Sequence, residues 1–192
     1  MANIQKAPPS TPAILMYCII GITAVTAAVF FTLYYGIFFK NPIFLWVGIV
    51  SFTIMYRLWM RIIMGNVSKL FKVSYKSPWF KEKGFEKPLY KLLRVKKWKG
   101  KALTYNPELY DVKTCSLEDI ANTTAKSELD HLINIGISLS TVAFGFIWGE
   151  LWIFAVTAFF AALFDSHFIV IQRYNRPRLI RLIKREKGKS GR

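Results

Sequence analysis

The chain has 192 residues, 53% of them hydrophobic, and a formal net charge of +16. This length gives room for one domain, and apolar segments occupy so much of it that a separate soluble catalytic domain is disfavoured. The two cysteines, Cys18 and Cys115, have no paired spacing and no histidines at zinc-ligand spacing, so we expect no disulfide framework, no metal site and no cofactor.

Four apolar segments are each close to the ~20 residues that cross a hydrocarbon core of ~30 Å. They lie at residues 12–39, 43–64, 132–148 and 151–171. The sequence therefore predicts an all-α integral membrane protein with four transmembrane helices in a single membrane domain, residues 1–192. Because the first apolar run continues past any small-residue cleavage site, it is interpreted as an anchor and not as a removed signal peptide.

Positive charge is distributed unevenly around these spans. If the connection between the second and third spans is cytoplasmic, only Lys40 of the 27 lysines and arginines lies in an outward connection. By the positive-inside rule both termini are then cytoplasmic, and residues 40–42 and 149–150 form short outer hairpins. Basic residues that flank spans and alternate with aromatic residues fit anionic lipid headgroups, and we expect no nucleic-acid partner.

The cytoplasmic loop, residues 66–131, holds 14 basic and 8 acidic residues. Its segment FEKPLYKLLRVKKWKGK, residues 85–101, predicts an amphipathic helix that lies in the membrane interface, with Trp98 at headgroup depth. The apolar face of this helix consists of Phe85, Leu89, Leu92 and Leu93.

The third and fourth spans are joined by the dipeptide Gly149-Glu150, which predicts a tight turn and an antiparallel helical hairpin. Residues equally distant from this turn lie at the same depth. Counting along the chain places Asn134 level with Asp165, His131 level with His167 and Phe168, and Glu128 level with Ile171 and Gln172. The hairpin therefore predicts a polar pocket near the cytoplasmic interface.

His131 is the candidate general base of this pocket. Glu128 precedes it by three residues, a helical spacing that permits contact, and a carboxylate can fix the imidazole tautomer and stabilise the imidazolium. The alternative is a polar helix terminus that only meets water. Ionisable groups within a span, such as Asp165, favour a functional interpretation, whereas Arg57 and Arg61 are interpreted as side chains that snorkel to the inner surface.

The fourth span ends in QRYNRPRL, residues 172–179. Candidate groups there for binding phosphate, carboxylate or sugar hydroxyls are Gln172, Arg173, Tyr174, Asn175, Arg176 and Arg178. A positive-inside anchor accounts for the arginines alone. Pro177 disfavours helical geometry at Arg176, so we expect a bend there and a separate amphipathic helix over residues 177–187. Its apolar stripe consists of Leu179, Ile180, Leu182 and Ile183.

Three blocks of sequence resemble the small bacterial membrane acyltransferases typified by the glycosyl-diaponeurosporenoate acyltransferase of staphyloxanthin carotenoid synthesis. The resemblance covers approximately residues 79–182. It rests on LYKLLRVKKWKGK (residues 89–101), SELDH (residues 127–131) and FDSHFIVIQRYNRPRL (residues 164–179). It implies transfer of a fatty acyl group to a hydroxyl of a glycosylated isoprenoid or other lipid, in a bacterial cell membrane.

The expected mechanism is direct transfer from an acyl thioester. His131, oriented by Glu128, deprotonates the acceptor hydroxyl, and an oxyanion donor comes from Gln172, Asn175 or Arg173. Lys97 and Lys99 hold the phosphates of acyl-CoA or the acidic face of an acyl carrier protein, and Trp98, Asn134 and Asp165 complete the substrate site. A covalent route through Cys115 is disfavoured, because nothing local activates its thiol.

Two other classes of protein remain open. A noncatalytic lipid-binding or partner-scaffolding protein uses the same amphipathic helices but does not need Glu128, His131 and Gln172 at one depth. A small membrane methyltransferase or reductase needs a nucleotide-cofactor pocket, which four spans and one loop scarcely provide. The sequence does not specify the oligomeric state.

Overall fold

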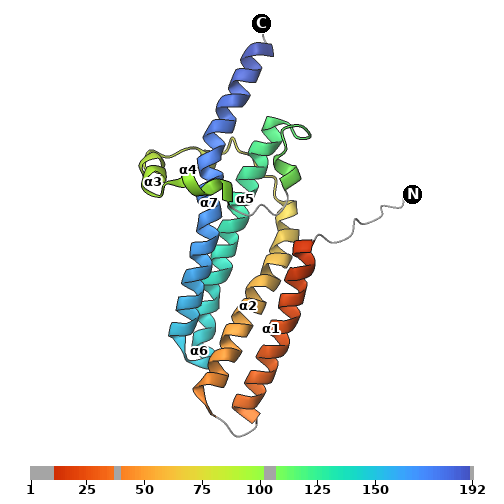
Figure 1. The fold of residues 1–192 in the computed structure, drawn as a ribbon, viewed down its shortest axis with the longest axis vertical. Coiled ribbons are helices and arrows are strands. Elements are labelled where there is room, and N and C mark those ends of the chain that lie inside the picture. The colour runs from red at the N-terminus through yellow and green to blue at the C-terminus, as the bar shows by residue number, and fades with distance from the viewer. Residues whose placement is uncertain (1–10, 37–39, 102–106, 191–192) are drawn as a thin grey trace, which may run out of the picture. The chain divides into compact units, whose positions relative to one another are not determined.

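The computed structural model describes residues 11–36, 40–101 and 107–190, and within these ranges every regular element is a helix (Figure 1). Four stretches are long and apolar enough to cross a membrane by length and composition: Ile14–Gly36, Pro42–Leu70, Leu117–Trp148 and Leu151–Lys189. The predicted all-α class with four membrane-crossing helices is confirmed on this basis. Residues 37–39 of the first predicted span lie outside the described residues, as do the terminal segments 1–10 and 191–192.

The helices belong to two compact units. The first unit comprises Met1–Ile63 with Ser140–Ala158, and the second comprises Met64–Leu139 with Phe159–Arg192. Three long helices, α2 (Pro42–Val67), α5 (Leu117–Ser140) and α7 (Leu151–Ser190), contribute to both units. The segments that carry the expected catalytic and substrate-binding side chains all lie in the second unit.

The first unit contains α1 (Thr11–Gly36), most of α2 (Pro42–Val67), the 3-10 turn η5 (Thr141–Phe144) and α6 (Gly145–Trp148). Asn41 caps α2, because its side-chain oxygen accepts a hydrogen bond from the Ile43 amide at 3.0 Å. The core joins α2 to the first turn of α7 through Leu45, Ile49, Ile153 and Phe154. The predicted tight turn after α6 is present, with positive φ at Gly149 (73°) and Glu150 (50°).

Arg57 of α2 does not snorkel, and that prediction is wrong. Its guanidinium is buried in the first unit and donates to the Thr157 carbonyl at 2.9 Å, to Thr141 Oγ1 at 2.9 Å and to Thr157 Oγ1 at 3.1 Å. A helical side chain leans toward the N-terminus of its own helix, which here carries Arg57 away from the predicted inner surface. Oxygen atoms of Thr141 and Thr157 therefore accept the hydrogen bonds that a snorkelling guanidinium would donate to water at the membrane surface.

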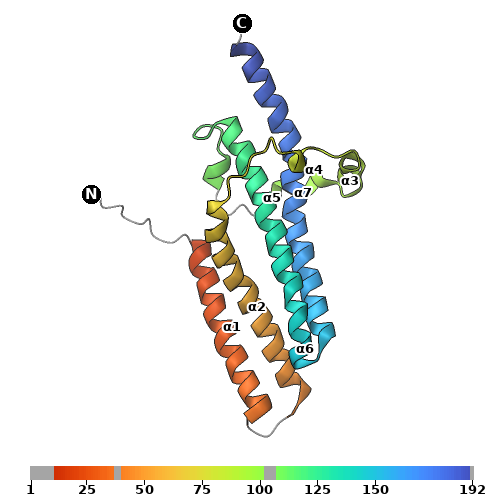
Figure 2. The same cartoon turned by 180° about the vertical axis from the view of Figure 1, so that it is seen from behind.

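The second unit is built around the antiparallel pair of α5 and the later part of α7, which lie side by side in both views (Figures 1 and 2). α5 begins at Leu117, well inside the segment expected to be a loop. Ser116 caps its N-terminus, because Ser116 Oγ accepts from the Asp119 amide at 3.1 Å and donates to Asp119 Oδ2 at 2.6 Å. Shorter elements complete the unit: η1 (Ser68–Leu70), η2 (Pro78–Phe80), α3 (Glu86–Leu92), α4 (Val95–Trp98), η3 (Lys99–Lys101) and η4 (Pro107–Tyr110).

The predicted interfacial helix is divided into α3 and α4. The break occurs at Arg94, whose backbone is left-handed with φ 49° and ψ 39°. The polar side of α3 turns toward the protein, where Glu86 and Tyr90 are buried. The apolar side remains outward, with Phe85 62% exposed and Leu92 79% exposed, which suits a membrane interface.

α7 continues through Pro177, so the predicted bend at Arg176 and the separate helix over residues 177–187 are wrong. Proline at an interior position leaves the carbonyl four residues earlier without its helical partner. Contacts of the Arg176 side chain with Phe80 of η2 and with Thr124 and Glu128 of α5 hold this turn in place within the second unit. The C-terminal apolar stripe also has a protein partner, because Ile180 and Ile183 pack in a cluster with Ala121 and Ala125 of α5.

Candidate functional site

His131 of α5 is paired with Asp165 of α7. The His131 Nδ1 atom lies 2.9 Å from Asp165 Oδ1, and the Asp165 side chain is fully buried. The imidazole also stacks on the Phe168 ring, with centroids 4.8 Å apart and an interplanar angle of 6°. The equal depth predicted for His131 and Phe168 is therefore confirmed. With Nδ1–H donated to the carboxylate, the neutral imidazole presents the lone pair of Nε2.

Glu128 does not orient His131, which corrects the pairing expected from helical spacing. The Glu128 side chain, only 1% exposed, faces two arginines of α7. Its Oε1 accepts from Arg173 Nε at 2.8 Å, and its Oε2 lies 2.7 Å from Arg176 Nη2 in an ion pair that is not a well-aligned hydrogen bond. A buried carboxylate is stabilised far more by two cations than by a neutral imidazole, and this decides its partner.

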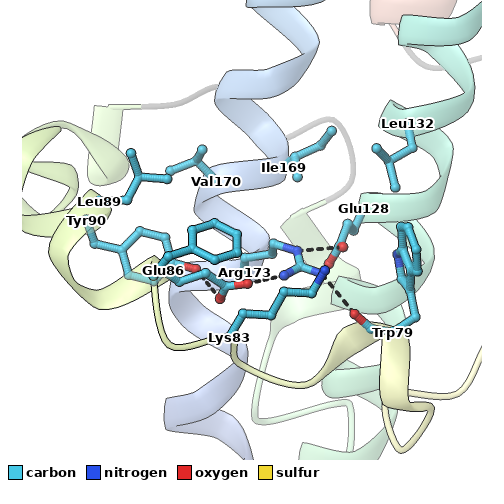
Figure 3. A pocket seen from close by; sticks show the side chains of 11 residues that line it. Trp79, Lys83, Glu86, Leu89, Tyr90, Glu128, Leu132, Ile169, Val170 and Arg173 are labelled. Atoms are coloured by element: carbon cyan, nitrogen blue, oxygen red, sulfur yellow. Dashed lines mark hydrogen bonds and ion pairs between the residues drawn. The ribbon is translucent and has the colours of Figure 1, made fainter.

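Arg173 and Arg176 belong to a group of four charges with Glu86 of α3 and Glu128, of which Arg173 is partly buried and the other three are buried. Figure 3 shows Arg173 between Glu86 and Glu128. Arg173 is ion-paired with Glu86 and donates to the Trp79 carbonyl at 2.9 Å. Glu86 also accepts from the Tyr90 hydroxyl at 2.8 Å, and burial together with this contact raises the pKa of Tyr90. Two carboxylates thus face two guanidiniums. The sequence predicts that Arg173 and Arg176 bind anionic groups of a substrate, but both are already ion-paired with carboxylates of the protein.

We expect Glu128→Gln to destabilise the folded protein by about 3 to 5 kcal/mol, because breaking a buried ion pair leaves charge uncompensated. The measurement is the unfolding midpoint in detergent micelles. The matched control is Glu118→Gln, which removes the exposed pair of Glu118 with Lys187 and should leave the midpoint unchanged. Equal midpoints for both variants would show that the Glu128 contacts contribute little to folding.

Gln172 contacts α5 at the depth that the hairpin register predicts for it. Its side-chain amide donates to Ser127 Oγ at 3.2 Å and to the Tyr110 hydroxyl at 3.4 Å. Burial raises the pKa of Tyr110, so this phenol stays neutral near neutral pH. Asn134, half-buried, lies one turn beyond His131 on α5.

A separate cationic group surrounds Tyr174. Lys99 Nζ and the Arg178 guanidinium lie 5.0 and 4.5 Å from the centre of the Tyr174 ring, and Arg178 donates to the Tyr174 hydroxyl at 2.7 Å. Lys99 also donates to Asn175 Oδ1 at 2.8 Å. Burial, followed by the charge of Arg178, lowers the pKa of Lys99. Two cations beside one ring make this part of the protein positive, which favours the binding of an anion.

Trp98 does not extend away from the protein. Its indole stacks on His167 of α7, with centroids 4.1 Å apart, and donates to the Leu93 carbonyl at 2.8 Å. This contact fixes α4 on α7, whereas Lys97 is exposed. His167 therefore has a packing role that its sequence position did not indicate.

A hollow of about 270 Å³ lies where α3, α5 and α7 meet in the second unit. Figure 3 shows alkyl side chains along one side of it and the charged group along the other. Sequence reasoning missed Glu86, Trp79 and Tyr110. These residues lie in the segment between the second and third spans, and the register between spans does not predict where that segment folds back onto the helices. Within the part of the chain that the structure describes, no group of three His, Cys, Asp or Glu side chains is arranged to hold a metal ion.

Residues 76–185 match the family model for glycosyl-4,4'-diaponeurosporenoate acyltransferase. Among curated proteins, the chain is 33% identical over 107 residues to the glycosyl-4,4'-diaponeurosporenoate acyltransferase of Staphylococcus aureus strain Newman, covering 51% of this chain and 62% of that protein. It is 32% identical over 99 residues to the protein of that name from strain COL, covering 47% of this chain and 57% of the relative.

The chain thus spans roughly three fifths of the length of these relatives. No solved structure matches it. The matched region contains α3, α4, α5 and the part of α7 that carries Asp165 and the cationic group. On the extent of the family match, this chain belongs to the glycosyl-4,4'-diaponeurosporenoate acyltransferase family.

Proposed function

We propose that this protein is a membrane-bound O-acyltransferase that moves a fatty acyl group from an acyl thioester to a hydroxyl of a glycosylated isoprenoid or other lipid. The observation that carries the proposal is the pair of His131 with the fully buried Asp165, at 2.9 Å. A carboxylate that accepts the hydrogen bond from Nδ1–H keeps the lone pair of the imidazole on Nε2, where it can accept a proton. Family membership supports acyl transfer as the reaction class.

In the proposed reaction, His131 Nε2 takes the proton of the acceptor hydroxyl as its oxygen attacks the thioester carbonyl. The tetrahedral intermediate then collapses, the carbon–sulfur bond breaks, and the imidazolium returns the proton to the leaving thiolate. Asp165 stabilises the imidazolium between these steps and is not itself protonated. Phe168 covers one face of the ring and limits its rotation.

Asn175 is the preferred donor to the oxyanion among the three residues considered. Its Oδ1 accepts from Lys99, so its amide N–H groups remain available for a ligand. Gln172 directs its amide at Ser127 and Tyr110, and Arg173 is engaged by Glu86 and Glu128. A preorganised donor to the developing oxyanion stabilises the transition state.

Lys99 and Arg178 are proposed to bind phosphate groups of the donor, with exposed Lys97 adding to the positive potential. The donor is acyl-CoA or an acyl carrier protein, both of which present phosphate. An anion placed between Lys99 and Arg178 relieves the repulsion between them.

The proposed location is a bacterial cell membrane, with both termini cytoplasmic. The exposed apolar face of α3 then rests on the inner leaflet, near the anionic headgroups that basic residues of the same segment attract. This arrangement brings a membrane acceptor and a cytoplasmic donor to the same depth.

The experiment that tests this function is mass spectrometry of membrane lipids from cells that express the wild-type gene, the His131→Ala variant or neither. We expect acylated glycolipids only with the wild-type protein. Wild-type lipids identical to those of cells without the gene would favour the noncatalytic lipid-binding alternative, provided that the protein is present in the membrane.

A further inference from the structure

The hollow beside α7 has no part in the proton transfer described above. Its alkyl wall comes from three helices: Leu89 of α3, Leu132 of α5, and Ile169 and Val170 of α7. Figure 3 shows these four side chains along one side, with Glu86, Arg173 and Glu128 in a row along the other. The hollow therefore has one apolar end and one polar end.

The apolar end faces the membrane-spanning part of the unit. On α5, Leu132 follows Glu128 by one turn, and on the antiparallel α7 Ile169 and Val170 precede Arg173. Both steps lie within the candidate spans and lead toward the turn at Gly149-Glu150, away from the proposed cytoplasmic side. An alkyl chain that enters from the hydrocarbon meets alkyl walls first.

The polar end carries charges of both signs, because its lining includes Lys83 and Arg173 together with Glu86 and Glu128. Arg173 is paired with Glu86 and Glu128, and Arg176 with Glu128. The alkyl part of a ligand is therefore favoured against the opposite, apolar wall, where no charged group is desolvated.

The alkyl wall is continuous with the candidate catalytic pair. Leu132 is the residue after His131, and Ile169 is the residue after Phe168, whose ring stacks on the His131 imidazole. The same helical turns therefore hold the proposed base and the wall of the hollow. A chain in the hollow would have its carbonyl end near the reacting groups.

We propose that this hollow is the subsite for the fatty acyl chain of the donor and that Leu132, Ile169 and Val170 set the chain length accepted. This inference rests on the proposed acyl transfer. The occupant is the part of the fatty acyl chain nearest the thioester carbonyl, with that carbonyl on the His131 side of the hollow.

The first test measures selectivity. Purified protein in nanodiscs receives an equimolar mixture of saturated acyl-CoA donors of increasing chain length and one glycolipid acceptor, and the products are separated by mass. Ile169→Phe and Val170→Phe should shift the preferred product to shorter chains, with the short-to-long ratio changing on the order of 10-fold per methylene excluded. Leu163→Phe is the matched control, since Leu163 lies on the same helix but is 56% exposed. A product distribution unchanged in both hollow variants, at wild-type rates, would overturn the proposal.

The second test does not need turnover. An acyl-N-acetylcysteamine thioester with a photoactivatable diazirine near its carbonyl is irradiated with the wild-type protein, and labelled peptides are identified. Labelling at Leu132, Ile169 or Val170, suppressed by unlabelled acyl thioester but not by the same concentration of phospholipid, supports a donor-chain subsite. Labelling suppressed equally by phospholipid, or absent from the hollow, rejects it. A wild-type protein that labels there but transfers no chain to any acceptor would contradict the proposed reaction and leave the subsite standing.

Discussion

Replacing His131 with alanine is expected to reduce acyl transfer by about 10²- to 10⁴-fold, the contribution typical of a positioned general base. Alanine removes the only imidazole that the structure places against a buried carboxylate among the described residues. The substitution shortens no span and leaves the four-charge group of Glu86, Glu128, Arg173 and Arg176 untouched. Membrane insertion and abundance should therefore stay at wild-type levels.

The matched control is His167→Ala, because the chain contains two histidines and His167 lies on the adjacent helix. His167 stacks on Trp98, so its loss should loosen α4 without removing the base. Rates are measured per molecule of protein in purified membranes, with an acyl-CoA donor and a glycolipid acceptor. If His167→Ala loses activity while His131→Ala retains it, the roles of the two histidines are the reverse of those proposed.

The depth of each side chain along the third and fourth spans could be predicted from the sequence. Apolar length locates the spans, and a glycine-containing turn of two residues fixes the register between antiparallel helices. The stack of His131 on Phe168 and the contact of Gln172 with Ser127 follow from that register. Depth alone does not say which way a side chain turns.

The partners of charged side chains could not be predicted from spacing within one helix. Glu128 and His131 are three residues apart on α5, yet buried charge seeks opposite charge, and the two arginines that neutralise Glu128 lie across the helix pair on α7. Glu86 reaches the same group from α3, a segment whose basic and apolar pattern indicated only membrane contact. A contact between segments that are distant in the chain produces no periodic pattern of residues, so spacing within one helix does not predict it.

The continuation of α7 through Pro177 is a second feature that could not be predicted from the local sequence. Local preference at Arg176 predicts a bend, but tertiary contacts override such preferences. The ion pair of Arg176 with Glu128 and the packing of Ile183 against α5 both require α7 to continue. These contacts form only because α5 begins at Leu117, and the extent of α5 was itself underestimated.

Replacing Asp165 with asparagine is expected to lower kcat by about 10²- to 10⁴-fold, with little change in KM. Asparagine has nearly the same shape, but its amide can donate to His131 Nδ1, which favours the tautomer with the proton on Nε2 and so removes the lone pair that accepts the substrate proton. It also cannot stabilise the imidazolium.

The kinetic readout separates this positioning role from a structural one. Asp165→Asn and Glu128→Gln are compared at equal amounts of folded protein, with kcat and KM measured for the acyl-CoA donor. Asp165→Asn should lose kcat while its unfolding midpoint falls less than that of Glu128→Gln, because an amide of nearly the same shape can still hydrogen-bond to the His131 ring, whereas Glu128 faces two guanidiniums. Glu128→Gln should lose stability but keep the kcat of each folded molecule. The opposite result, with kcat lost only in Glu128→Gln, would restore Glu128 as the carboxylate that orients His131 and would require the two side chains to meet during catalysis.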